Sequence, residues 1–92
     1  MRFEWDDAKN RSNRLKHSLG FELACRAFDD PFHRSVQDRF VDGEERWQTI
    51  GLVHGVMLVL VAHTYHDDDA GDVIRIISAR RATRQERRLY EE

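Results

Sequence analysis

Near the start of the chain, hydrophobic and polar positions are spaced as in a short strand followed by a helix. Residues 2–5 alternate polar and apolar side chains, and Asp6 after them is a suitable helix N-cap. Small or apolar residues then recur at i, i+4, i+7 and i+11, namely Ala8, Ser12, Leu15 and Leu19. This spacing predicts a helix that buries one stripe and stops at Gly20.

A second helical pattern begins at about Phe21. Its buried face is predicted to consist of Phe21, Ala24, Cys25 and Phe28. Pro31 ends the helix, because proline disfavours helical backbone in the residue before it. We expect Cys25, on the apolar face, to be a small buried thiol without a chemical role.

Beyond Pro31 the pattern changes to alternation, which predicts three or four strands joined by short turns. Residues 33–40 form the weakest strand and are expected at an edge, and Asp42-Gly43 is a strong hairpin signal before residues 45–53. Residues 56–62 are apolar at every position. A strand without alternation is buried on both faces, so it should lie at the centre of the sheet.

The last third predicts an acidic turn over residues 66–72, a strand over residues 73–79 and a terminal helix. Thr83 and Glu86 form the T-x-x-E capping box of that helix. Strict alternation along the strand would place Ile74, Ile76 and Ser78 on one face and Arg75, Ile77 and Ala79 on the other. The predicted fold class is α+β: two N-terminal helices packed on an antiparallel sheet of four to five strands, with a C-terminal helix.

Length and composition narrow the class of protein. Ninety-two residues predict one domain, residues 1–92, with one core. No apolar run approaches the roughly 20 residues that span a bilayer, and the N-terminus lacks the apolar segment of a signal peptide, so we expect a cytoplasmic protein without membrane contact. The formal net charge is −2, yet six arginines crowd one C-terminal segment: Arg75, Arg80, Arg81, Arg84, Arg87 and Arg88. This asymmetry predicts a local basic face.

Arg75 is the most informative of these arginines, since a sheet interior rarely holds a charge without a partner or a function. It should face away from Ile74, and Arg46 on the preceding hairpin could line the same concave surface. Guanidinium groups that share a face bind phosphate through paired N–H donors. The competing interpretation, which composition alone favours, is that the arginines form surface ion pairs with Glu86, Glu91 and the acidic turn.

The sequence gives no support for metal or cofactor chemistry. His63 and His66 are three residues apart on a predicted strand and therefore point to opposite faces, where they cannot share an ion unless a bulge intervenes. The acidic run at residues 67–69 is more typical of a solvated turn than of a cation site. Motifs for nucleotide binding and acyl transfer are absent, so we expect neither a metal nor a cofactor.

A family resemblance adds to this interpretation. The chain contains, in order, the segments FEWDDAKNRSN, LKH, FELACRAFDDP, GEERWQTIG, LVLVAHTY and VIRIISARRATRQERRLYEE. In this order and spacing they resemble the BrnT-type toxins, the toxic half of a type II toxin–antitoxin pair, whose fold is similar to that of the RelE ribonucleases. The match runs nearly end to end.

The resemblance implies an endoribonuclease that cleaves mRNA and halts translation. It also implies a cognate antitoxin, typically a ribbon-helix-helix DNA-binding protein, which neutralises the toxin and with it represses the operon; such pairs can form heterotetramers. Functional positions carry over onto Lys16, His17, Arg46 and Arg80. BrnT-type toxins commonly carry an arginine shortly after the H-T pair, whereas this chain has His66 there.

RNA cleavage without metal needs phosphate binding and proton transfer. We predict that the catalytic residues are Arg46, His66, Arg75 and Arg80. The predicted substrate-binding residues are Lys16, His17, His63, Tyr65, Arg81 and Arg84. The sequence does not decide which histidine exchanges protons. Two alternatives remain open: a module that binds nucleic acid or a partner without catalysis, and a structural subunit of a toxin–antitoxin complex.

Overall fold

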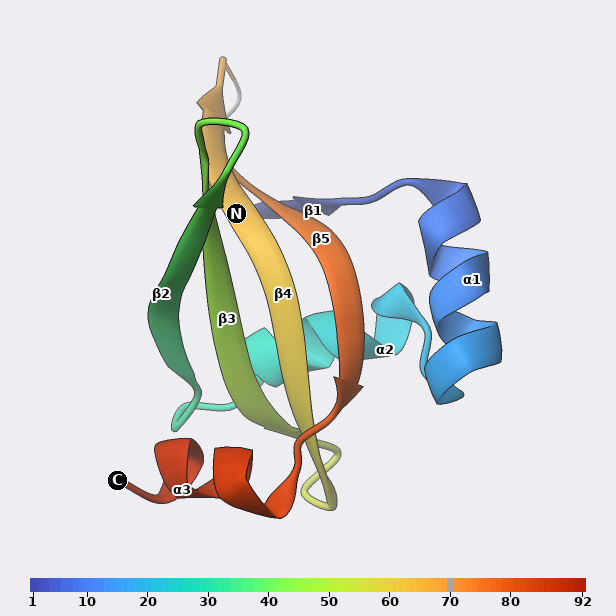
Figure 1. Ribbon diagram of the computed structural model, residues 1–92, viewed down its shortest axis with the longest axis vertical. Helices are drawn as coiled ribbons and strands as arrows, with labels where there is room; N and C mark the ends of the chain where they lie inside the picture. Colours follow the sequence, from blue (N-terminus) through green and yellow to red (C-terminus); the bar gives the residue numbers. More distant parts are fainter. Residues whose placement is uncertain (70) are drawn as a thin grey trace.

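The computed structural model describes residues 1–69 and 71–92 and consists of one five-stranded sheet with helices on both faces (Figure 1). The elements are β1 (Arg2–Glu4), α1 (Asp7–His17), α2 (Phe21–Ala24), the 3₁₀ helix η1 (Cys25–Asp29), β2 (Arg34–Val41), β3 (Glu44–Val53), β4 (Met57–Asp68), β5 (Gly71–Arg81) and α3 (Arg84–Glu91). Ala70, in the predicted acidic turn, lies outside the described residues. None of the described helices is long and apolar enough to cross a bilayer.

The strand order is β1-β5-β4-β3-β2, which confirms β4 as the centre and β2 as an edge. The prediction of a purely antiparallel sheet is wrong, because β1 pairs with β5 in parallel, with Arg2 opposite Val73. A parallel pair needs a long connection between its strands, and here the rest of the chain supplies it. An alternating pattern does not reveal strand direction, so this pairing could not be read from residues 2–5.

The side of the sheet covered by α1, α2 and η1, here called the helix face, holds most of the core. Its buried side chains include Phe21, Val61, Ile74 and Ile76. The predicted second helix is divided into α2 and the tighter η1. A Cβ atom on Gly51 of β3 would lie 2.2 Å from the carbonyl oxygen of Ala27, so glycine at this position lets the η1 backbone pack directly on the strand.

Helix α1 contacts the sheet through polar residues, and the predicted apolar stripe is wrong. Leu15 is 90% exposed, whereas Asn10 and Asn13 are buried. The Asn13 side-chain amide donates to the carbonyl of Ala79 (2.7 Å) and accepts from the Ala79 N–H (3.2 Å), where β5 extends beyond its pairing with β1. Because α1 covers a strand edge with unpaired backbone groups, its inner face must be polar.

Turn signals in the sequence were reliable. Asp42 and Gly43 both have positive φ, at 50° and 79°, as a two-residue hairpin requires. The β4–β5 hairpin is longer than predicted, because β4 continues to Asp68 and β5 begins at Gly71. Acidic side chains exposed on a two-stranded ribbon do not prevent its backbone from pairing.

The opposite side of the sheet is called the arginine face, because the strand register places Arg46, Arg75 and Arg80 on it. At one end it is closed by α3, whose Leu89 and Tyr90 pack with Ala82 against buried side chains of β3 and β4: Ile50, Leu58 and Leu60. Figure 1 shows α3 crossing the end of the sheet that is opposite to the β2–β3 and β4–β5 turns. The rest of the arginine face is the region in which the predicted site residues lie.

Candidate functional site

Three strands place Arg46, Thr64 and Arg75 in one row on the arginine face. Thr64 pairs with Arg75 across β4 and β5, and Arg46 on β3 comes one residue before Trp47, which pairs with His63. Neighbouring strands lie about 4.8 Å apart, so the Arg46 and Arg75 backbones are about 10 Å apart. Arg75 is exposed while Ile74 and Ile76 are buried on the helix face, which confirms the predicted orientation of Arg75.

A β-bulge at Ile77 brings Arg80 onto the same face as Arg75. Ala62 pairs with Ser78 while His63 pairs with Ile76, so Ile77 is the extra residue. Arg75 and Arg80 are five positions apart, and strict alternation would place them on opposite faces. The predicted alternation beyond Ile76 is therefore wrong. No local signal in the sequence indicates the bulge.

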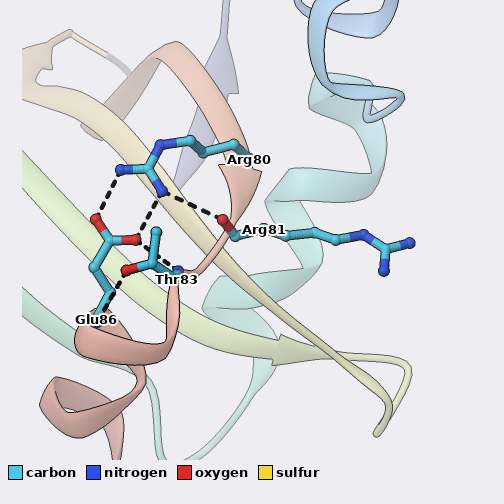
Figure 2. A network of polar contacts seen from close by, with 4 residues as sticks. All are labelled: Arg80, Arg81, Thr83 and Glu86. Atoms are coloured by element: carbon cyan, nitrogen blue, oxygen red, sulfur yellow. Dashed lines mark hydrogen bonds and ion pairs between the residues drawn. The ribbon is translucent and has the colours of Figure 1, made fainter.

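Arg80 is held by a carboxylate. Its Nη1 and Nη2 atoms donate to the two carboxylate oxygens of Glu86, each at 2.7 Å (Figure 2). Glu86 also accepts from the backbone N–H of Thr83, whose hydroxyl accepts from the N–H of Glu86, which confirms the predicted capping box. The hydrogen bonds from Arg80 lower the pKa of Glu86 to about 2. Arg80 is thus bound to α3 in this structure.

Arg81 and Arg84, the other predicted contacts in this region, point elsewhere. Figure 2 shows the Arg81 side chain extending away from the Arg80–Glu86 pair. Arg81 pairs with Val59, a core residue of the helix face, and is exposed. Arg84 is exposed in the first turn of α3. Neither side chain shares the row of Arg46 and Arg75.

Arg46 and Thr64 carry complementary buried groups that are not paired. Among the described residues, the Nε of Arg46 and the hydroxyl oxygen of Thr64 are buried without a hydrogen-bond partner. The nearest carboxylate oxygen to Arg46 Nε belongs to Glu44, at 3.8 Å, which exceeds hydrogen-bonding distance. Leaving such groups unpaired costs about 1–3 kcal/mol each. The row between Arg46 and Arg75 therefore has unused hydrogen-bonding capacity.

Arg75 lines an open cavity of about 360 Å³ together with Glu4, Trp5 and Asp6. The pKa of Asp6 is lowered, mainly by the helix N–H groups of Lys9 and Ala8 and to a smaller extent by the charge on Arg75. Among the described residues, no carboxylate forms an ion pair with Arg75, in contrast to Arg80. Its guanidinium is available to a ligand.

The predicted residues Lys16 and His17 lie at the edge of β5. They line a cavity of about 250 Å³ between α1 and β5, whose other lining residues are Lys9, Ser12, Asn13, Ile77 and Ser78. The described lining contains two lysines and a histidine but no carboxylate. Ser78 is exposed and lies on the arginine face, so this cavity adjoins that face across the β5 edge. Sequence analysis missed Lys9 and Ser78, and Ser78 lies on this side of the sheet only because of the bulge.

Two predicted substrate contacts, His63 and Tyr65, lie on the helix face instead. His63 is fully buried, and its Nε2 is 2.7 Å from the hydroxyl of Thr49. Burial lowers the pKa of His63 to about 4, so its ring is neutral at physiological pH. Tyr65 packs against Trp47 with ring centroids 5.4 Å apart. The sheet separates these side chains from Arg46 and Arg75.

His66 is exposed near the β4–β5 hairpin and lies on the same strand face as Thr64. It pairs with Val73, two residues before Arg75, and its Nε2 is 3.3 Å from a carboxylate oxygen of Glu4. The structure thus brings His66 near Arg75. It stands on the other side of Arg75 from Ser78 and the lysine-lined cavity.

Comparisons with known proteins agree with this architecture. The family model described as the ribonuclease toxin BrnT of type II toxin–antitoxin systems matches residues 5–86. The fold is similar to the crystal structure of the Brucella abortus ribonuclease toxin BrnT, with a TM-score of 0.58 and 21% identity over 91% of this chain and 99% of that chain. No curated protein matches the chain significantly in sequence. Since the family model covers most of the 92 residues, the chain belongs to the BrnT family of ribonuclease toxins of type II toxin–antitoxin systems.

Proposed function

We propose that this ribonuclease toxin is an endoribonuclease that cleaves mRNA without a metal ion and thereby inhibits translation. The observation that carries the proposal is the placement of cationic side chains on both sides of Ser78. Lys16 and His17 lie in the cavity at the β5 edge, and Arg75 lies on the arginine face. An RNA strand that crosses β5 at Ser78 would meet cations before and after the strand.

Cleavage requires the ribose 2′-hydroxyl to attack the adjacent phosphorus while the bond to the 5′-oxygen breaks. One proton leaves the 2′-oxygen and one reaches the 5′-oxygen, which yields a 2′,3′-cyclic phosphate and a 5′-hydroxyl. Arg75 and Arg46 would stabilise the charge of the phosphorane, as preorganised donors do in other phosphoryl and acyl transfers. His17 and His66 are the exposed or half-exposed imidazoles near this surface, and we assign proton transfer to this pair.

The remaining predicted residues receive supporting roles. The prediction that Arg80 binds the scissile phosphate remains a prediction; because Glu86 holds its guanidinium, we propose that Arg80 positions α3 at the end of the site. Arg81 and Arg84 would attract the RNA backbone from outside the row. His63, which is buried, and Tyr65, which lies on the helix face, would not contact the scissile phosphate.

We propose that the antitoxin implied by the family is a ribbon-helix-helix protein. It would neutralise the toxin in the cytoplasm and carry it to operator DNA, so that the complex represses its operon. The complex would be a heterotetramer. In this proposal residues 1–92 act as one domain with a RelE-like fold.

Purified toxin incubated with a long mRNA in the presence of EDTA tests the catalytic proposal. We expect discrete fragments with 2′,3′-cyclic phosphate ends, and no cleavage where the 2′-hydroxyl is replaced by hydrogen. Arg75→Ala and His17→Ala should each reduce cleavage by about a hundredfold or more. Arg26→Ala is the matched control, because Arg26 is exposed and pairs with Asp29. Fragments that disappear in EDTA, or full activity in both site variants, would overturn the mechanism.

A second candidate is a module that binds RNA or the antitoxin without cleaving RNA. Two observations favour it. The guanidinium of Arg80 is bound to the Glu86 carboxylate instead of being open to a phosphate, and His66 stands where BrnT-type toxins commonly carry arginine. Retention of a labelled RNA on the protein without the appearance of fragments would support this candidate over the ribonuclease.

A further inference from the structure

Three aromatic residues, Phe40, Trp47 and Tyr65, lie on the helix face near the β2–β3 and β4–β5 turns. Trp47 and Tyr65 are in edge-to-face contact at 5.4 Å. Phe40 of β2 pairs with Glu45 of β3, two residues before Trp47, and so lies on the same face. Phe40 is 65% exposed and Tyr65 44% exposed, whereas the core of the helix face is fully covered. Exposed aromatic side chains gathered on one face of a protein are typical of interaction surfaces.

A cavity of about 290 Å³ adjoins this aromatic group at Tyr65. Its described lining consists of Met1, Tyr65, His66, Asp67, Asp72, Val73 and Ile74. Tyr65, Val73 and Ile74 supply apolar wall. Asp67 and Asp72 place carboxylates at the same cavity, so its shape and chemistry suit a side chain with an aliphatic stem and a charged end.

The charge around these aromatic rings is negative. Asp67 faces Asp72 directly across β4 and β5, and the hydrogen bond and repulsion between them raise the pKa of Asp67. Like charges opposite one another destabilise a strand pair. Glu45 adds a third carboxylate beside Phe40. In the described part of this surface and cavity there is no lysine or arginine.

The surface formed by Phe40, Glu45, Trp47, Tyr65, Asp67 and Asp72 is called the aromatic–acidic surface. A cation is the group that this combination attracts, since aromatic faces and carboxylates both stabilise Arg and Lys side chains. An RNA strand would be repelled by the three carboxylates, so the rings are poorly suited to stacking its bases. Arg46 and Arg75, which are proposed above to bind the phosphate, lie on the other side of the sheet.

We propose that the aromatic–acidic surface docks the antitoxin through a segment in which an Arg or Lys side chain enters the cavity beside Tyr65 while apolar neighbours cover Phe40 and Trp47. The antitoxin is the occupant because membership in a type II toxin family implies this partner. Docking here leaves the arginine face to be covered by another part of the same partner. The proposal rests on the family and on charge complementarity, and it does not depend on the catalytic roles of Arg46 or Arg75.

The test measures the affinity of the toxin for the antitoxin encoded beside its gene, by calorimetry at low and high salt. Two toxin variants probe the surface: the isosteric double variant Asp67→Asn/Asp72→Asn, which also relieves a like-charge contact, and Tyr65→Ser. Each should weaken antitoxin binding about tenfold or more, a loss of the size of one cation–π or charged contact. The double variant should also reduce the salt dependence of binding.

Phe32→Ser and Asp38→Asn are matched controls, because Phe32 is 74% exposed and Asp38 is exposed, and neither belongs to the aromatic–acidic surface. Their antitoxin affinity should stay within twofold of the wild type. RNA cleavage by the Tyr65→Ser variant should be unchanged, which separates this proposal from the catalytic one. Absence of nuclease activity in the wild type would count against the catalytic proposal alone.

Three results would overturn the docking proposal. Unchanged antitoxin affinity in both surface variants would show that the partner binds elsewhere. If a surface variant bound a single-stranded RNA oligonucleotide more weakly than the wild type while its antitoxin affinity was unchanged, the aromatic rings of this surface would belong to an RNA-binding site. A change in the oligomeric state of the toxin alone, measured by light scattering, with antitoxin affinity intact, would assign the surface to a second copy of the chain.

Discussion

Arg75 and Arg80 lie on the same strand and the same face of the sheet, about 13 Å apart along the strand direction, yet their surroundings differ. Both terminal nitrogens of the Arg80 guanidinium donate to the Glu86 carboxylate, whereas Arg75 faces an open cavity. An arginine held by a carboxylate stabilises the fold, and one without such a partner can bind an anion. Identical residue types on one strand can therefore serve different purposes, and the partner rather than the arginine decides which.

The bulge at Ile77 separates the two arginines by one extra residue, and deletion of Ile77 tests whether that residue is needed for the fold. Ile77 has no partner on β4, so without it Arg80 would keep its partner Leu60 and stay on the arginine face. We therefore expect the variant to fold, with a loss of about 0.5–3 kcal/mol in the free energy of unfolding. Circular dichroism during thermal unfolding measures this, with Ile77→Val as a control that should lose about 1 kcal/mol or less. A variant that does not fold would show that the bulge itself is required for the strand pairing.

Arg75→Ala should separate activity from stability. We expect RNA cleavage to fall by about 10² to 10³, the usual cost of losing a donor that stabilises a transition-state charge, with an unchanged melting temperature. Arg75→Lys should recover part of the activity. A large loss of stability instead would mean that Arg75, like Arg80, is part of the fold.

Arg80→Ala, in contrast to Arg75→Ala, should reduce the stability of the fold more than it reduces RNA cleavage. It removes a bidentate, charge-assisted contact that also orients the capping residue Glu86, so we expect a loss of about 1–2 kcal/mol in the free energy of unfolding. A double-mutant cycle with Glu86→Ala measures the coupling in denaturant titrations. If Arg80→Ala abolished cleavage at unchanged stability, Arg80 would be the phosphate ligand that the sequence predicted.

The smallest expected effect is a change in acid stability. The pKa of Glu86 is lowered from 4.5 to about 2 by Arg80, so its contribution to stability is fully present above pH 4.5 and is lost as the pH falls toward 2. Glu86→Gln should therefore reduce the pH dependence of the free energy of unfolding between pH 4.5 and 2, and leave it unchanged at higher pH. The buried neutral ring of His63, whose pKa is lowered from 6.5 to about 4, also stops contributing to stability as the pH falls from 6.5 to 4. This loss is the same in the wild type and in Glu86→Gln, so it cancels when the two proteins are compared.

Features with a local cause were predictable from the sequence. The Asp42-Gly43 turn, the capping box and the central position of residues 56–62 depend on neighbouring residues, and the structure has all of them. Arg75 was placed correctly because the alternation around it is regular.

Features with a distant cause were not predictable. Asn13 is buried because it pairs with the backbone of Ala79, and β1 is parallel because its partner is the last strand. The bulge at Ile77 reverses the orientation of every later residue of β5, so the positions of Ser78 and Arg80 on the arginine face depend on a single irregularity. The site residues were therefore recognisable by type, but their arrangement on the face required the structure.

The pairing of β1 with β5 also has a consequence for protein synthesis. Arg2 lies opposite Val73, so the first strand emerges from the ribosome long before its partner exists. The nascent chain can form its helices and the β2–β3–β4 meander, but the sheet stays incomplete until β5 has been released, because contacts this distant in sequence form late. Arg75 is carried by that same strand. The surface on which we propose catalysis is therefore completed only after β5 has emerged.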